Sequence, residues 1–119
     1  MNKPLPVNYL KIYRGRTGFL LQDMAELIGM HVGNLSKIET GQVTPSLEVV
    51  LAYHVIFKIP VEKLCKNHVK GCVHELLLRS ESLRESLLDT KASKSVYRRL
   101  ELLDIIIDRL RDIGEVYAK

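Results

Sequence analysis

The stretch Leu20–Glu39 constrains the fold of this 119-residue chain most, because it has the pattern of two short helices joined by a tight turn. Ala25 is small enough to let a second helix approach at a steep angle, and Gly29 can adopt the positive φ that ends a helix. The apolar residues that define the pair are Met24, Ala25, Leu27 and Ile28 before the turn, and Val32, Leu35 and Ile38 after it. Helices this short are not stable alone, so we expect other helices to bury their apolar faces.

The composition is that of one globular domain with at most an appendage. Apolar residues make up 46% of the chain and charged residues 27%, which excludes a disordered chain. No apolar run approaches the roughly 18 residues of a membrane span, since Lys58, Glu75 and Asp104 interrupt the longest ones. The N-terminus lacks the features of a signal peptide, so we expect a cytoplasmic protein with reduced thiols at Cys65 and Cys72.

Most of the positive charge lies in the first half of the chain. The formal net charge is +4, and residues 1–67 carry eight Lys or Arg against five Asp or Glu. Residues 68–119 are nearly balanced, with ten basic and nine acidic residues. This modest excess is compatible with a polyanionic partner but does not require one.

One further helix is predicted on the N-terminal side of the pair, and a turn is predicted directly after it. Pro4 and Pro6 predict an extended arm over residues 1–8. Asn8 is then expected to cap a helix from Tyr9 to Arg16, with Gly18 beyond its end. Gly41 is expected to take a left-handed conformation after Glu39.

The sequence TPSLE predicts the start of a fourth helix, with Thr44 as N-cap and Pro45 at the first helical position. This helix should run to Phe57 and bury one face, made of Leu47, Val50, Leu51, His54 and Val55. After Pro60, a short fifth helix is expected from Val61 to Asn67. Residues 1–67 are therefore predicted to contain a compact five-helix domain.

Residues 68–119 are predicted to form two longer helices. An amphipathic helix ends near Leu88, a polar connection covers residues 89–93, and a second helix follows. The second helix has a heptad-like apolar stripe at Val96, Leu100, Leu103, Ile107, Leu110 and Tyr117, with Gly114 at the remaining position. Two interpretations stay open: this hairpin packs onto its own first domain, or it forms a dimer through the same surface.

Residues 9–67 resemble the phage-repressor type of helix-turn-helix, the Cro/CI or XRE family. The residues that carry the resemblance are Leu10, Arg14, Gly18, Met24, Ala25, Gly29, Leu35, Ser36, Ile38, Glu39, Gly41, Pro45, Ser46, Leu47 and Val61–Leu64. The landmarks align without gaps. The resemblance implies an all-α, lambda-repressor-like domain that binds double-stranded DNA, and a buried ion pair between Arg14 and Glu39. A guanidinium can satisfy both carboxylate oxygens while it joins two helices.

The resemblance also implies which residues meet DNA. The recognition helix covers residues 31–39, and its implied contacts are His31, Val32, Gly33, Asn34, Ser36 and Lys37. Asn34 suits adenine, Lys37 suits guanine or phosphate, and Val32 suits a thymine methyl. Gly33 allows close approach to the groove. Phosphate contacts are expected from Thr40, Gln42 and Lys37.

The sequence departs from the family where the first helix of the pair begins. The family has a polar pair there that grips a phosphate, whereas this chain has Leu20 and Leu21. Gln22 is one position later and is the candidate replacement, although its direction differs by about 100° around the helix. Leu20 and Leu21 belong either to the core or to an apolar contact with a partner.

No constellation of an enzyme or of a usual metal site is present in the sequence. Cys65, His68, Cys72 and His74 fall within ten residues, but Gly71 is expected to interrupt the helix that would align them. Inert packing or surface positions are therefore favoured over metal binding or redox sensing, and no cofactor is expected. The sequence thus predicts a homodimeric DNA-binding transcription regulator, most simply a repressor. The alternative is a protein-interaction module, an antitoxin or anti-repressor partner, that uses the apolar C-terminal helices.

Overall fold

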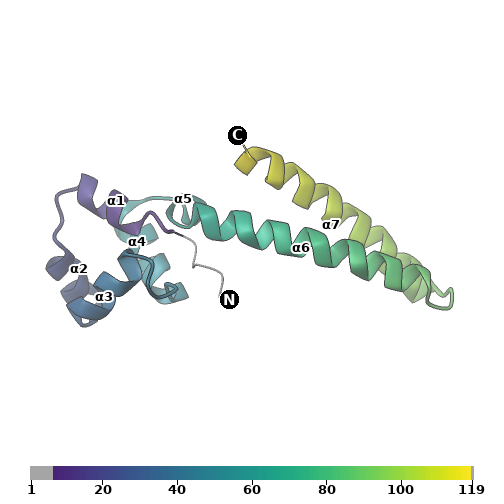
Figure 1. The fold of residues 1–119 in the computed structure, drawn as a ribbon, viewed down its shortest axis with the longest axis horizontal. Helices are drawn as coiled ribbons and strands as arrows, with labels where there is room; N and C mark the ends of the chain where they lie inside the picture. The colour runs from purple at the N-terminus through teal and green to yellow at the C-terminus, as the bar shows by residue number, and fades with distance from the viewer. Residues whose placement is uncertain (1–6, 119) are drawn as a thin grey trace. The chain divides into compact units, whose positions relative to one another are not determined.

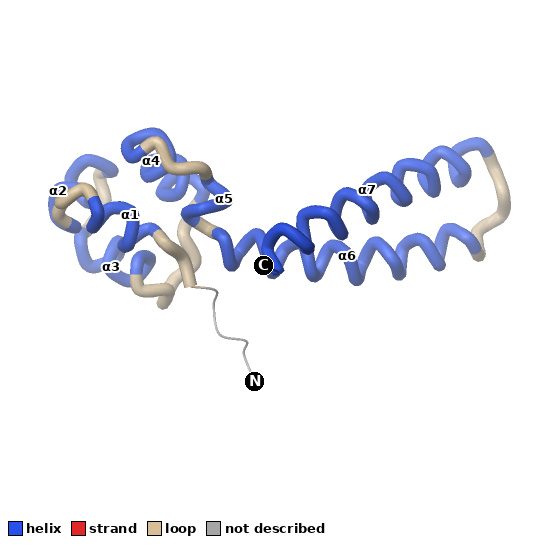
Figure 2. The backbone as a smooth tube through the Cα atoms, turned by 90° about the horizontal axis from the view of Figure 1, so that it is seen from above, coloured by secondary structure: helices blue, strands red, loops and turns tan. Residues whose placement is uncertain are grey.

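The computed structural model describes residues 7–118, which form seven α-helices and no strand (Figures 1 and 2). The chain divides into two compact units, one up to Val69 and one from Lys70. The predicted all-α fold is confirmed. The extended arm predicted for residues 1–8 lies largely outside the described residues.

The first unit contains five helices around one core. They are α1 (Leu10–Arg16), α2 (Leu21–Ile28), α3 (Val32–Glu39), α4 (Leu47–Phe57) and α5 (Val61–Leu64). Each of the five contributes buried side chains, and the core consists of Leu10, Met24, Ala25, Leu35, Ile38, Val49, Val50, Tyr53, Leu64 and Cys65. This shared core stabilises helices that are too short to persist alone.

The turn between α2 and α3 has the predicted geometry. Gly29 adopts φ +81°, and the N–H groups of Gly29 and Met30 both donate to the Ala25 carbonyl at 2.9 Å. Ala25 itself is buried where the two helices approach. The left-handed conformation expected for Gly41 is confirmed, with φ of +83°, and Gly18 beyond the end of α1 also has a positive φ of +80°.

The first helix begins one residue later than predicted, and its N-cap is Tyr9 instead of the predicted Asn8. The Asn8 Oδ1 atom accepts a hydrogen bond from the Leu10 N–H at 3.1 Å. Asn8 is buried, so this side chain is part of the core of the first unit.

The predicted start of α4 is wrong. Ser46, not Thr44, is the N-cap, and its hydroxyl accepts from the Val49 N–H at 3.3 Å. Thr44 and Pro45 both precede the helix. Ser46 also carries a capping hydroxyl, and it lies directly before the apolar run.

The predicted buried face of α4 is also wrong, apart from Val50. The helix buries Val49, Val50 and Tyr53, whereas Leu47 and Val55 are 65% and 71% exposed. The helix is apolar on almost every side, so periodicity could not select the face. Its aromatic residues select it, because the Phe57 ring packs edge-on against Phe19 and Tyr53.

The boundary after α5 differs from the prediction too. The fifth helix ends at Leu64 instead of Asn67, and α6 (Lys66–Leu88) begins after Cys65. The interruption expected at Gly71 is absent, since Gly71 lies inside α6. A helical glycine costs only about 1 kcal/mol relative to alanine, which a packed helix of 23 residues tolerates.

The second unit is the predicted helical hairpin. Helix α6 and helix α7 (Lys94–Ala118) lie side by side and antiparallel, joined by residues 89–93 (Figures 1 and 2). Buried side chains recur every seven residues along α6, and the heptad-like stripe of α7 supplies their partners. The seam contains Val73, Ser80, Leu87, Val96, Leu103, Ile107 and Leu110. Within the described residues, no helix is long and apolar enough to cross a membrane.

Candidate nucleic-acid interface

The end of α3 is fixed to α1 by a buried ion pair. Arg14 Nε donates to Glu39 Oε2 at 2.8 Å, and Arg14 Nη2 donates to Glu39 Oε1 at 2.9 Å. The third guanidinium nitrogen, Nη1, donates to the Phe19 carbonyl at 2.7 Å. The hydrogen bond that Arg14 donates to the Glu39 carboxylate raises the pKa of Arg14. The pair implied by the resemblance is therefore present, and the loop before α2 is attached to it.

Tyr53 is a third member of this network that the sequence did not reveal. Its hydroxyl donates to Glu39 Oε2, so the carboxylate joins α3 to α4 as well as to α1. Burial raises the pKa of Tyr53, and the hydrogen bond to Glu39 raises it further. A tyrosine inside an apolar helix usually needs a partner for its hydroxyl, and this is the signal that could have identified Tyr53.

Asn8 makes a second connection to the same end of α3. Its Nδ2 atom donates to the Ile38 carbonyl at 2.8 Å, while its Oδ1 atom accepts from the Leu10 N–H. Ile38 is one of the last residues of α3, whose final carbonyls have no partner within the helix. The final turn of α3 is therefore positioned by side chains from α1 and α4 and by the residue that precedes α1.

The opposite side of α3 is open. Leu35, Ile38 and Glu39 are buried, whereas Asn34 and Lys37 are exposed and Ser36 is half-buried. At about 100° per residue, Gly33 and Lys37 lie nearly opposite the buried residues. Val32 packs partly against the core, so it offers less surface than the other predicted contact residues.

His31 and Gly33 act together at the start of α3. The His31 Nδ1 atom accepts a hydrogen bond from the Gly33 N–H at 3.1 Å, so His31 is the N-cap. A Cβ atom at Gly33 would lie 3.1 Å from the His31 ring. The absence of a side chain at Gly33 thus makes room for the capping imidazole of His31. It also leaves space on the open side of α3.

The polar residues expected to meet phosphates are also exposed. The Thr40 hydroxyl donates to the Ser36 carbonyl at 2.9 Å, and Gln42 Nε2 donates to the Thr40 hydroxyl at 3.2 Å. Gln22 lies exposed in the first turn of α2. Leu20, immediately before α2, is 61% exposed, and its N–H donates to the Asp23 carboxylate at 3.1 Å. Leu20 is therefore not a core residue.

The cysteine and histidine cluster is not gathered into a metal site. Among the described residues, no three His, Cys, Asp or Glu side chains are placed so that they could hold a metal ion. Cys65 is buried and Cys72 is exposed, and both are free thiols. Burial raises the pKa of Cys65 and lowers that of His68.

Comparison with known families supports the first unit as a helix-turn-helix domain. Residues 7–64 match a family model described as a helix-turn-helix domain. The match covers α1–α5 and ends where α5 ends. The search of curated proteins gave no match, and neither did the search of solved structures.

Proposed function

We propose that this chain is a sequence-specific DNA-binding transcription regulator of the phage-repressor type, and that it acts as a repressor. In this proposal α3 enters the major groove, with Asn34 and Lys37 facing base edges or phosphates. The second helix of a helix-turn-helix pair is the element that reads the groove. Thr40, Gln42 and Gln22 would contact the backbone, and such contacts position a protein without reading sequence.

One observation carries the proposal: α3 is fixed on one side by buried polar contacts and is open on the other. Arg14, Tyr53 and Asn8 hold its final turn through Glu39 and Ile38. Asn34 and Lys37 lie exposed on a helix whose orientation is thereby set. A helix held in this way can present the same side chains to each binding site without paying an ordering cost on binding.

The proposed binding unit is a homodimer on a paired operator. Two recognition helices related by a two-fold axis meet successive major grooves about 34 Å apart. A single α3 of this composition offers few base contacts, because Gly33 has no side chain and Val32 is partly buried. Two copies would add their contacts and so reach a useful affinity.

The test is binding of the full chain to the DNA upstream of its own gene and to a random duplex of equal length, over a salt series. We expect preferential binding to the upstream DNA. Replacing both Asn34 and Lys37 with alanine should abolish this preference. If Lys37 contacts a phosphate, its loss also lowers the slope of log K against log salt by about one. Lys63→Ala is the control, because Lys63 is an exposed lysine on α5. Equal binding of the wild type to both duplexes would contradict the proposal.

A further inference from the structure

We propose that two copies of this chain associate through one side of the α6–α7 hairpin, the side that carries Leu76 and Leu83, and form a four-helix bundle. The proposal names the dimer surface of the regulator described above and rests on that proposed function. The hairpin has two different sides, one on each flank of its buried seam.

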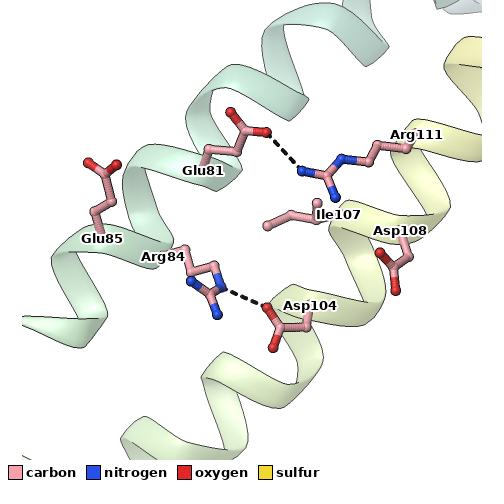
Figure 3. Close-up of a pocket in the computed structure, with 7 residues that line it drawn as sticks. All are labelled: Glu81, Arg84, Glu85, Asp104, Ile107, Asp108 and Arg111. Atoms are coloured by element: carbon pink, nitrogen blue, oxygen red, sulfur yellow. Dashed lines mark hydrogen bonds and ion pairs between the residues drawn. The ribbon is translucent and has the colours of Figure 1, made fainter.

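The first side is charged, and its charges pair between the two helices (Figure 3). Arg84 Nε lies 2.8 Å from Asp104 Oδ1, and Arg111 Nη2 lies 3.4 Å from Glu81 Oε1. Figure 3 shows these pairs bridging from α6 to α7, with Ile107 between them. Two ion pairs within the hairpin already join α6 to α7 on this charged side, so we do not expect a second copy to bind there.

The second side is an apolar groove. Its volume is about 230 Å³, and it is lined by five apolar side chains, Ser80 and the charged Arg79; the apolar ones are Leu76, Leu83, Leu103, Ile106 and Leu110. Leu76 and Leu83 are 46% and 48% exposed, one on each side of the small Ser80 along α6. A groove with leucine walls and a small residue in its floor suits the ridge of another helix.

Helix α7 carries a second apolar stripe beside the one that fills the seam. Leu102, Ile106, Ile113 and Val116 follow one another at steps of four, seven and three residues. Leu102 is 56% exposed and Ile106 is half-buried, so the contact between α6 and α7 does not fully bury this stripe. Two adjacent heptad stripes are typical of a helix with two neighbouring helices. Within the described part of the second unit, α7 has one.

The hairpin also buries too little on its own. The buried apolar side chains of its described residues are Val73, Leu87, Val96, Leu103, Ile107 and Leu110. Of these, Leu87, Leu103 and Ile107 form a contiguous cluster, with Leu77 and Leu100 partly buried against it. A unit of 50 residues with so small a core needs further burial to be stable. A partner that covers the groove would bury the additional apolar surface.

A second copy fits this groove in size and symmetry. A helix of 23 residues is about 35 Å long, and two packed helices are about 20 Å wide, so one side of the hairpin presents on the order of 700 Å². Specific dimers bury about 800 Å² per partner. A two-fold axis places the same patch on both copies, so the stripes of α6 and α7 would meet their own counterparts and complete a bundle of two layers.

The test compares two leucines of α6 that are about equally exposed to solvent but lie on different sides of the helix. Leu83 faces the groove and is 48% exposed, and Leu78 is 53% exposed and lies about 140° around the helix from Leu83. Because both are half-exposed, a glutamate at either position leaves its carboxylate in solvent in the isolated hairpin. We expect the wild type and Leu78→Glu to sediment as dimers, and Leu83→Glu to sediment as a monomer at the same concentrations.

A second measurement needs no substitution. Cys72 is exposed and lies one turn before Leu76, so at about 100° per residue it is on the same side of α6 as Leu76. The buried Cys65 serves as an internal reference. We expect alkylation of Cys72 by N-ethylmaleimide to slow as the concentration of wild type rises through the dimerisation range. A rate independent of concentration would overturn the proposal, whether the groove is then empty or covered by the chain's own first unit.

The outcomes separate this proposal from the proposed function. A monomeric wild type that still prefers its upstream DNA would overturn the dimer surface and leave DNA recognition standing. A Leu83-dependent dimer that binds both duplexes equally would support the surface and contradict sequence-specific regulation. Equal effects of Leu78→Glu and Leu83→Glu on the mass would also overturn the proposed surface.

Discussion

Arg14 on α1 and Glu39 at the end of α3 are joined by two parallel hydrogen bonds of 2.8 and 2.9 Å. The side chain of Arg14 is 10% exposed and that of Glu39 is 2% exposed, so neither charge is solvated by water. Loss of one partner would leave the other buried and unpaired, which is far more costly than loss of a surface pair. The position of the proposed recognition helix therefore depends on this contact.

Replacing Glu39 with alanine should lower the free energy of unfolding by about 3–5 kcal/mol, because Arg14 would remain buried without its anion and Tyr53 would lose its acceptor. Urea denaturation followed by circular dichroism measures this change. The matched control is Asp104→Asn, which breaks the Arg84–Asp104 pair, where Asp104 is 55% exposed. That substitution should cost at most about 1 kcal/mol. Similar losses in the two variants would show that Glu39 is not the anchor of α3.

Replacing Tyr53 with phenylalanine should cost about 1.5–3 kcal/mol, the usual contribution of a hydrogen bond to a charged group. The ring remains, so its contact with Phe57 is kept and the fold should not change. The measurement is again the free energy of unfolding in urea at neutral pH. Tyr97→Phe is the control, because Tyr97 is 60% exposed on α7 and should change stability little. A loss equal to that of the control would remove Tyr53 from the network.

Replacing Gly29 with alanine should destabilise the domain by about 1–2 kcal/mol, because its φ of +81° is unfavourable for a residue with a Cβ atom. No neighbouring atom would collide with that Cβ, so the effect reports backbone conformation alone. Gly15→Ala is the opposite control. Gly15 lies inside α1 with nothing within 4 Å of an added Cβ, so alanine there should stabilise by up to about 1 kcal/mol. Thermal melts of both variants test the pair, and the prediction fails if both shift in the same direction.

Features that depend on local chemistry could be predicted from the sequence. Gly18, Gly29 and Gly41 each end a helix or turn the chain, and their positive φ follows from the absence of a side chain. The Asn8 amide oxygen accepts the first N–H of α1, as an amide before a helix can, although the N-cap position itself is Tyr9. The antiparallel hairpin followed from the heptad-like stripe and the polar connection at residues 89–93.

Features that depend on competition between similar residues could not be predicted. Thr44 and Ser46 both carry a capping hydroxyl, and the sequence does not distinguish between them; Ser46 is the N-cap. The face of α4 was undetermined because nearly all its residues are apolar, so packing of Phe57 and the bond from Tyr53 to Glu39 decided it. The candidate contact residues Asn34 and Lys37 came from the family resemblance, since exposure on a helix is not itself a sign of DNA binding.

His68 should make the protein less stable below neutral pH. Its Nδ1 atom is buried without a hydrogen-bond partner among the described residues, and burial lowers the pKa of its imidazole below the ordinary 6.5. Below pH 6.5 the unfolded chain therefore binds more protons than the folded one, and stability must rise with pH in that range. The contribution of neutral His68 to the free energy of unfolding is fully present above about pH 6.5. It is lost as the pH falls through the lowered pKa of the folded state. We expect His68→Gln to reduce the difference in unfolding free energy between pH 7.5 and pH 5.5. His74→Gln, at an exposed position of α6, is the matched control. An unchanged difference in the His68 variant would assign the acid sensitivity to another group.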